Sequence, residues 1–253
     1  MPHWDSAQYL KFSGERTQPC RDLAARVELD SPSKVIDLGC GPGNSTEVIA
    51  ARWPKAQITG LDSSPAMIAS AREKHPEWRW NAAGITEWAW GGERYDLVFS
   101  NAALQWVADH GQVFPRLFER VADGGALAVQ MPGNWDGPAH RLMREVARRF
   151  GIAGRVREWF THDLEFYYDA LAPLAARVDL WATEYLHVMP DSEAIVEWYK
   201  GSGMRPFLEA LPDDGERARF AGEYLEEIRG TFAARADGRV LFPFRRLFLV
   251  AYR

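Results

Sequence analysis

The sequence predicts an α/β fold built on a mostly parallel sheet, with a helical insertion before the last strand. Three observations predict it. Short apolar runs alternate with helical patterns through the first half of the chain, as in strands joined by crossover helices. A glycine-rich turn follows the first apolar run. A long helical pattern at 191–235 then separates the last two strand-like runs.

Local signals define the elements of the first half. Residues 34–38 form an apolar run typical of a buried strand, and this run ends in the glycine-rich turn 39–43. Ser64 is a suitable N-cap, and Pro65 suits the first position of the helix that follows. Similar patterns predict strands at 57–61, 78–83, 95–100 and 126–131, and helices at 17–28, 45–52, 65–74 and 110–122.

The second half is predicted to be less regular. Its expected elements are a helix at 137–150, a strand at 178–188, the helical stretch 191–235 and a last strand at 246–252. We therefore expect a core of residues 1–190 and 243–253, with a helical cap, 191–242, inserted between the last two strands. His140 and Arg144, four residues apart on helix 137–150, are expected to face solvent, as is His110.

Composition indicates an ordinary folded protein. Of the 253 residues, 47% are hydrophobic and 26% are charged, which supports a packed core. The net charge of −5 disfavours nonspecific nucleic-acid binding, which usually needs a positive surplus. Cys20 and Cys40 form neither a disulfide framework nor a zinc site, so we expect no metal. With no signal-peptide pattern and no apolar run of about 20 residues, we expect a cytoplasmic protein without a membrane partner, monomeric or weakly associating.

The glycine-rich turn favours a nucleoside cofactor without phosphates. Its spacing is G-x-G-x-G, so the third glycine comes one residue earlier than in the dinucleotide pattern G-x-G-x-x-G. Pro42 also lacks the N–H donor that a pyrophosphate would use. Asp62, which ends the second strand, is suited to accept hydrogen bonds from both ribose hydroxyls, and Asp37 to hold an amino-acid moiety. S-adenosylmethionine has these groups and no phosphate.

Segments spread along nearly the whole chain carry a family resemblance. They are the opening Trp4-Asp5 with Tyr9-Leu10, Phe12-Ser13 and Glu15-Arg16, the segments 37–46, 62–68, 101–106 and 129–135, and the C-terminal pieces 194–198, 203–206 and 246–248. The N-terminal half resembles class I S-adenosylmethionine-dependent methyltransferases. With the segment 129–135 and the C-terminal pieces, the chain is similar to the trans-aconitate 2-methyltransferase family.

This resemblance implies a Rossmann-like seven-stranded sheet, mostly parallel with an antiparallel last strand, plus the helical cap. It also implies methyl transfer from S-adenosylmethionine to a carboxylate of trans-aconitate, which gives a monomethyl ester; methylation at position 2 rests on the resemblance alone. Gly84 stands where related enzymes often place an acid near adenine, so backbone groups around Gly84 and Ile85 are expected there. Cofactor binding is assigned to Tyr9, Arg16, Asp37, Gly39, Cys40, Gly41, Asn44, Asp62, Ser63, Met67, Gly84, Ile85, Asn101, Ala102 and Gln105.

Methylation of a carboxylate needs cationic side chains to bind the substrate and needs no general base. A carboxylate with a pKa of about 4 is already ionised at pH 7, so no catalytic side chain is nominated. Trans-aconitate would carry three negative charges, which arginine is suited to bind. An antiparallel last strand would start where the parallel strands end, which places Arg245 or Arg246 at that edge. Substrate binding is assigned to Asn134, Trp135, Tyr185, Arg205 and Arg246.

Three alternatives stay open. One is a methyltransferase for another small carboxylic acid or a hydroxyl compound. The second is a nicotinamide-dependent oxidoreductase, which the glycine spacing and Pro42 argue against. The third is a noncatalytic module that binds S-adenosylmethionine.

Overall fold

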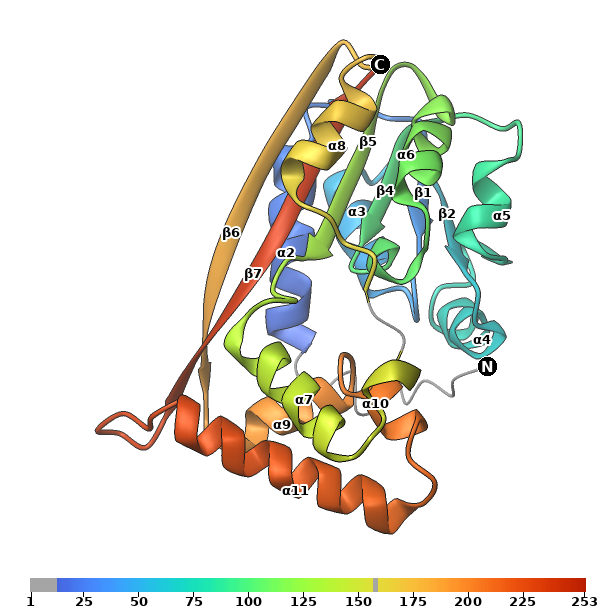
Figure 1. Cartoon of the computed structure of the whole chain (residues 1–253). Coiled ribbons are helices and arrows are strands. Elements are labelled where there is room, and N and C mark those ends of the chain that lie inside the picture. The colour runs from blue at the N-terminus through green and yellow to red at the C-terminus, as the bar shows by residue number, and fades with distance from the viewer. Residues whose placement is uncertain (1–12, 157–158) are drawn as a thin grey trace. The chain divides into compact units, whose positions relative to one another are not determined.

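The computed structural model describes residues 13–156 and 159–253. Within them lies a seven-stranded sheet of order β3-β2-β1-β4-β5-β7-β6 (Figure 1). Strands β1 to β5 pair in parallel, and β7 pairs with β5 antiparallel, as the resemblance implies. The strands are β1 (Lys34–Leu38), β2 (Gln57–Asp62), β3 (Arg79–Ala82), β4 (Tyr95–Asn101), β5 (Val121–Pro132), β6 (Arg177–Met189) and β7 (Val240–Tyr252).

The helices alternate with the strands up to β5 and then cluster in the second half. They are α2 (Ser13–Arg26), α3 (Asn44–Arg52), α4 (Pro65–Lys74), α5 (Ile85–Ala89), α6 (His110–Glu119), α7 (Pro138–Arg149), α8 (Leu164–Leu171), α9 (Ser192–Lys200), α10 (Arg205–Glu209) and α11 (Asp214–Thr231), with short 3-10 turns η1 (Leu104–Trp106) and η2 (Ala153–Arg155). None of the helices in the described ranges is both long and apolar enough to cross a membrane.

Most of the predicted elements are confirmed. The predicted start of α4, with Ser64 as its N-cap, is also confirmed. The Ser64 hydroxyl accepts a hydrogen bond from the Met67 N–H, and Pro65 is the first helical residue. The last strand begins six residues earlier than expected, at Val240, because Phe242 and Phe244 extend its buried face across Pro243. The five-residue α5 and the eight-residue α8 were not predicted, since their apolar periodicity is too short to detect.

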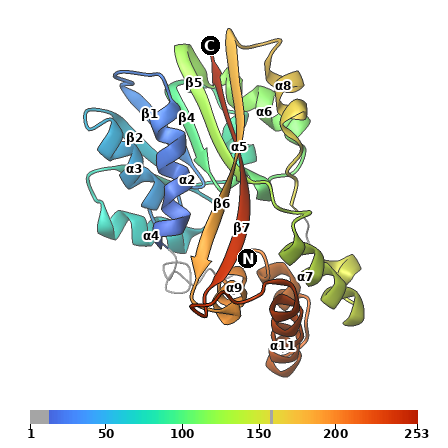
Figure 2. The same cartoon turned by 90° about the vertical axis from the view of Figure 1, so that its left-hand side faces the viewer.

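The chain divides into two compact units, and the larger contains residues 14–133, 159–183 and 246–253. Helices α5, α6 and α8 cover one face of its sheet, while α2, α3 and α4 lie on the other (Figures 1 and 2). The first face is apolar: Val98, Leu127 and Leu249 pack there with Phe114 of α6 and Tyr167 of α8. Burying these side chains is the main favourable contribution to the stability of this unit.

The smaller unit has a core of its own and, among the residues described, comprises 134–156 and 184–245. Helices α7, α9 and α11 pack together around buried Met143, Trp198 and Phe220. Tyr224 of α11 donates its hydroxyl to the carbonyl of Ala139 at 3.1 Å, which ties α11 to α7. This unit therefore contains the predicted insertion 191–242 and, in addition, α7 and η2, because the apolar side of α7 packs in the same core.

Candidate active site

The ends of four neighbouring strands carry the predicted cofactor residues of the larger unit. Strands β3, β2, β1 and β4 are adjacent and parallel, so their carboxyl ends meet at one edge of the sheet. The residues brought to this edge are Asp37, Gly39, Cys40, Gly41, Asn44, Asp62, Ser63, Met67, Gly84, Ile85, Asn101, Ala102 and Gln105. Tyr9 lies outside the described residues, as does the side chain of Arg16.

The turn after β1 has a conformation that requires glycine. Gly39, Gly41 and Gly43 have φ angles of 75°, 54° and 99°, which side chains disfavour. The N–H groups of Gly39 and Cys40 both donate to the carbonyl of Leu61 at the end of β2. A Cβ on Gly39 would lie 2.1 Å from the Cβ of Ala103, whereas a Cβ on Gly41 would meet no described atom within 4 Å. The backbone of Gly41 is therefore the open part of the turn.

Asp37 is fully buried at the end of β1. Its Oδ2 accepts hydrogen bonds from the hydroxyls of Ser45 at 2.6 Å and Thr46 at 2.7 Å, while its Oδ1 has no partner among the described residues. Burial raises the pKa of this carboxyl to about 6, against the two hydroxyls, which lower it. A buried acceptor with an open lone pair is suited to a cationic amine, which would stabilise the ionised form.

Backbone N–H groups fix the Asp62 carboxylate and leave about half of its hydrogen-bond acceptor positions open. Its Oδ2 accepts from the N–H of Gly41 at 3.0 Å and its Oδ1 from the N–H of Ser64 at 2.8 Å. Burial raises the pKa of the Asp62 carboxyl, and these two backbone N–H groups oppose the shift. A carboxylate offers about four lone-pair positions, so about two remain for a ligand. This arrangement suits the two hydroxyls of a ribose.

The ends of β2 and β3 contribute a mixed surface around Asp62. Ser63 is exposed and Met67 is buried in α4, while Asn44 is half-buried at the start of α3. Gly84 precedes α5, and a Cβ there would meet no atom of the described part within 4 Å. The space that an acidic side chain at this position would occupy is therefore open beside the backbone of Gly84.

The loop after β4 holds two open amide oxygens. Gln105 is buried and donates its Nε2 to the carbonyl of Ala102 at 2.7 Å. The Oε1 of Gln105 and the Oδ1 of Asn101 are buried without hydrogen-bond partners in the described ranges. Ala102 has a φ of 54°, which is uncommon for a residue with a side chain and marks local strain.

Strand register aligns further polar side chains on one face of the sheet. Asp37 pairs with Phe99, Asn101 lies two residues beyond Phe99, and Gln130 pairs with Asn101. On β7, Phe248 pairs with Gln130, and Arg246 lies two residues before it. Since side chains alternate along a strand, Asp37, Asn101, Gln130 and Arg246 share one face, and we call them the polar row.

Gln130 is a candidate functional residue that the sequence analysis missed. It is fully buried, and neither its Oε1 nor its Nε2 has a partner among the residues described. A buried amide left unpaired costs about 1–3 kcal/mol, so a bound group is the natural partner for it. Ser45 and Thr46 are further candidates that were not predicted, because their hydroxyls orient Asp37.

Arg246 is the substrate candidate that the larger unit contains. It pairs with Pro132, the last residue of β5, and therefore lies at the edge where the parallel strands end. Arg246 is only 5% exposed, whereas its neighbour Arg245 is exposed. Of the two arginines offered by the sequence, Arg246 has the buried position that a specific contact requires.

The other four substrate candidates belong to the smaller unit. The Nδ2 of Asn134 donates to the hydroxyl of Tyr199 at 3.2 Å, and the carbonyl of Trp135 accepts from Arg144 at 2.8 Å. Tyr185 stacks on His187 with ring centroids 6.1 Å apart. Arg205 is paired with Glu209 at 2.9 Å, one turn further along α10.

Two histidines are buried where the sequence analysis expected solvent. His140 is fully buried, with its ring 5.2 Å from Trp135 and 4.9 Å from Tyr199, and burial lowers the pKa of His140 to about 3. His110 contacts the hydroxyl of Tyr167 at 2.8 Å and the carbonyl of Leu104 at 2.9 Å. The solvated-face prediction is wrong for both, because Tyr199 and Tyr167, each distant in sequence, pack against His140 and His110 respectively.

Comparisons with known proteins agree with this geometry. A family model described as "Methyltransferase domain" matches residues 35–125. The chain is 48% identical over 255 residues to a trans-aconitate 2-methyltransferase of Azoarcus sp., covering all of both chains. It is 48% identical over 259 residues to the protein of that name from Variovorax paradoxus, covering 100% of this chain and 99% of the relative.

Solved structures share the fold at low sequence identity. The YcgJ protein of Bacillus subtilis aligns with a TM-score of 0.57 and 13% identity, over 93% of this chain and 98% of that one. Phosphoethanolamine N-methyltransferase 2 of Haemonchus contortus, solved with S-adenosyl-L-methionine, aligns with a TM-score of 0.58 and 16% identity, over 93% of this chain and 52% of that one. The structures support the fold, and the full-length relatives show that the chain belongs to the trans-aconitate 2-methyltransferase family.

Proposed function

We propose that this protein transfers the methyl group of S-adenosylmethionine to a carboxylate of trans-aconitate and releases the monomethyl ester. The full-length identity of 48% to relatives named for this reaction carries the assignment of the substrate. The geometry of the glycine-rich turn, with Asp37 and Asp62 beside it, supports the cofactor.

The residues at the strand ends fit this cofactor. The open Oδ1 of buried Asp37 suits the ammonium group of its amino-acid part, and the two remaining acceptor positions of Asp62 suit its ribose. Pro42 offers no N–H to a phosphate, and this cofactor has none. The space beside the backbone of Gly84 suits an adenine held without an acidic side chain.

The protein's part in the reaction is to bind and orient rather than to move protons. When bound, S-adenosylmethionine supplies a methyl group on a cationic sulfur, and the acceptor oxygen bonds to that methyl as the sulfur–carbon bond breaks. The acceptor carboxylate is ionised at neutral pH, so no side chain has to remove a proton. Asp37 and Asp62 hold the donor, which converts binding energy into orientation. The hydroxyls of Ser45 and Thr46 keep Asp37 in place, and the N–H of Gly41 keeps Asp62 in place.

Arginines and polar groups are proposed to hold the acid. The residues put forward are Asn134, Trp135, Tyr185, Arg205 and Arg246. Arg246 is the foremost of them, because a buried guanidinium binds a carboxylate more strongly than an exposed one. A cytoplasmic location and a monomeric or weakly associating state complete the proposal.

An acceptor panel with methyl-labelled S-adenosylmethionine tests the function. The panel contains trans-aconitate, other tricarboxylates, dicarboxylates, a phenol and an amine, with products identified by mass spectrometry. We expect label in a trans-aconitate monomethyl ester and weaker transfer to acids with fewer carboxylates. Transfer to the phenol or amine, but to no tricarboxylate, would refute the substrate.

A thermal-shift comparison separates the remaining alternatives. We expect S-adenosylhomocysteine to raise the unfolding temperature and NADH to leave it unchanged, since only a ligand of the folded state stabilises it. The opposite pattern would indicate an oxidoreductase. Stabilisation by S-adenosylhomocysteine with no transfer to any acceptor would indicate a noncatalytic binding module.

A further inference from the structure

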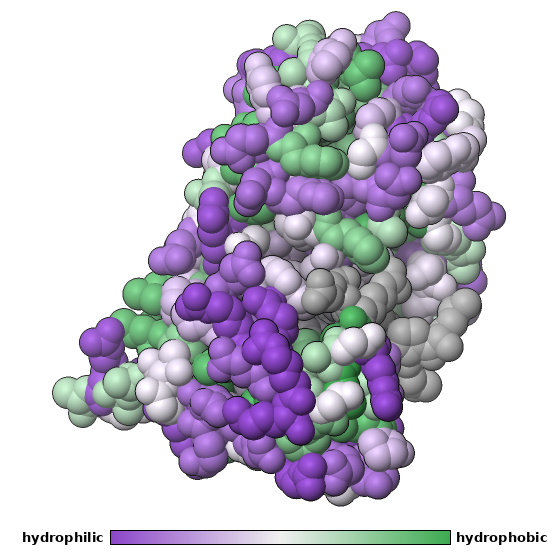
Figure 3. Space-filling view, in the orientation of Figure 1, coloured by the Kyte–Doolittle hydropathy of each residue, from purple (hydrophilic) through white to green (hydrophobic). Residues whose placement is uncertain are grey.

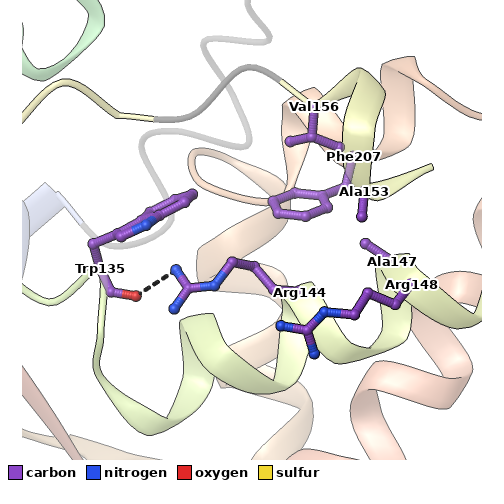
Figure 4. Close-up of a pocket in the computed structure, with 7 residues that line it drawn as sticks. All are labelled: Trp135, Arg144, Ala147, Arg148, Ala153, Val156 and Phe207. Carbon is purple, nitrogen blue, oxygen red and sulfur yellow. Dashed lines mark hydrogen bonds between the residues drawn. The ribbon is translucent and has the colours of Figure 1, made fainter.

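The smaller unit contains a pocket whose polar lining is mainly arginine. The pocket has a volume of about 120 Å³, and α7 contributes Arg144, Ala147 and Arg148 to it (Figure 4). Its other lining residues are Trp135, Ala153, Val156 and Phe207. Both arginine side chains extend in the same direction from α7 (Figure 4).

One of the two arginines is held in place by the aromatic side of the pocket. The guanidinium of Arg144 lies 4.6 Å from the centre of the Trp135 ring and donates to the Trp135 carbonyl at 2.8 Å. It also reaches the exposed carboxylate of Asp136 at 3.2 Å. These contacts fix the orientation of Arg144, which lowers the entropy lost when it binds a further group.

The second arginine has no acidic partner in the described ranges. Arg148 is exposed and is four residues from Arg144, so two like charges lie one turn apart, an arrangement that destabilises a helix. Its neighbour Arg149 differs, because it pairs with Glu223 and Glu227 of α11. Strongly hydrophilic residues gather over α7 in Figure 3, in keeping with this run of arginines.

The rest of the lining is apolar. Ala147, Ala153, Val156 and Phe207 provide a hydrocarbon surface next to the two guanidinium groups. A ligand complementary to such a pocket has a small carbon skeleton and more than one anionic group. An inorganic anion would gain nothing from the apolar part, and a fatty acid would offer only one charge.

We propose that this pocket binds the di- or tricarboxylate acceptor, with Arg144 and Arg148 each pairing with one of its carboxylates. The inference rests on the proposed function, because it takes the ligand to be the acid that is methylated. It adds two arginines that the sequence analysis did not select. It also gives a role to Trp135, which orients Arg144.

Arg148→Gln tests the proposal, with Arg141→Gln as its matched control. Arg141 is exposed on the same helix and carries the same charge, but it does not line the pocket. We expect Arg148→Gln to raise the KM for trans-aconitate about tenfold or more, from the loss of a charged hydrogen bond. The KM for S-adenosylmethionine should stay unchanged, and the unfolding temperature should not fall, because the substitution removes a like-charge pair on α7. Arg141→Gln should change neither KM by more than about twofold, since exposed charges away from the pocket act only weakly.

Acids that each lack one carboxylate sharpen the test. If Arg148 pairs with one carboxylate, the acid without that group should bind equally well to the wild type and to Arg148→Gln, while the other analogues keep the difference. Equal KM values for Arg148→Gln and Arg141→Gln, with normal wild-type turnover of trans-aconitate, would overturn the pocket assignment alone. Absence of wild-type turnover on any tricarboxylate would instead overturn the proposed function.

Discussion

Replacing two glycines of the same turn by alanine should separate conformational strain from steric overlap. Gly39 and Gly41 both have positive φ angles, so either substitution places a side chain in the left-handed region, at a cost of about 1–2 kcal/mol. Only at Gly39 would the new Cβ overlap another atom, 2.1 Å from the Cβ of Ala103. Overpacking of that kind costs about 1–3 kcal/mol more.

The expected losses in free energy of unfolding are therefore about 1–2 kcal/mol for Gly41→Ala and about 2–5 kcal/mol for Gly39→Ala. Alanine also restricts the unfolded chain, but this effect is common to both variants and cancels in their difference. Urea unfolding followed by tryptophan fluorescence measures both values.

A double variant tests whether the overlap is the cause. Ala103→Gly removes the atom that the new side chain would meet, so Gly39→Ala with Ala103→Gly should recover the steric part of the loss. Measured against Ala103→Gly alone, the added Gly39→Ala should cost only the conformational part, as Gly41→Ala does. Equal stability of the two single variants, or no recovery in the double variant, would contradict the turn geometry on which the cofactor site depends.

Three further predictions concern the polar row. Burial raises the pKa of Asp37 from 3.8 to about 6, so ionisation opposes folding: stability relative to Asp37→Asn should be greatest below about pH 4 and fall by about 3 kcal/mol as pH rises through 6, measured by urea unfolding without ligand. A rise in relative stability over that range would contradict the assignment. Gln130→Met should raise the unfolding temperature of the ligand-free protein, because it removes an unpaired buried amide, and should lower kcat/KM for trans-aconitate. A lower unfolding temperature with unchanged kcat/KM would mean that the amide already has its partner. Arg246→Ala should raise the KM for trans-aconitate about tenfold or more with a small effect on the KM for S-adenosylmethionine, whereas exposed Arg245→Ala should change neither. Equal effects of Arg246→Ala on the two KM values would count against a substrate role.

Local signals explain why the N-terminal half of the fold could be predicted. The runs 34–38 and 57–61 are short, apolar and bounded by turn residues, and Ser64 and Pro65 mark a helix start by their own chemistry. The extended β7 could not be read in the same way, because Pro243 interrupts a pattern whose Phe242 and Phe244 are buried by helices of the smaller unit.

The site shows the same division between local and distant causes. Asp37 and Asp62 could be selected because each lies at the end of a strand that leads through a short turn into a helix. Gln130 could not be selected, because its place beside the other polar side chains depends on the register of β4, β5 and β7. His110 was misjudged for a similar reason, since its partner Tyr167 lies 57 residues further along the chain.

The central claim is that the glycine-rich turn and Asp62 hold the nucleoside of S-adenosylmethionine. A crystal structure of the protein with S-adenosylhomocysteine tests it most directly. We predict both ribose hydroxyls within hydrogen-bonding distance of the Asp62 carboxylate and the amino group beside Oδ1 of Asp37. Ligand density elsewhere, or a ribose that does not contact Asp62, would contradict the account.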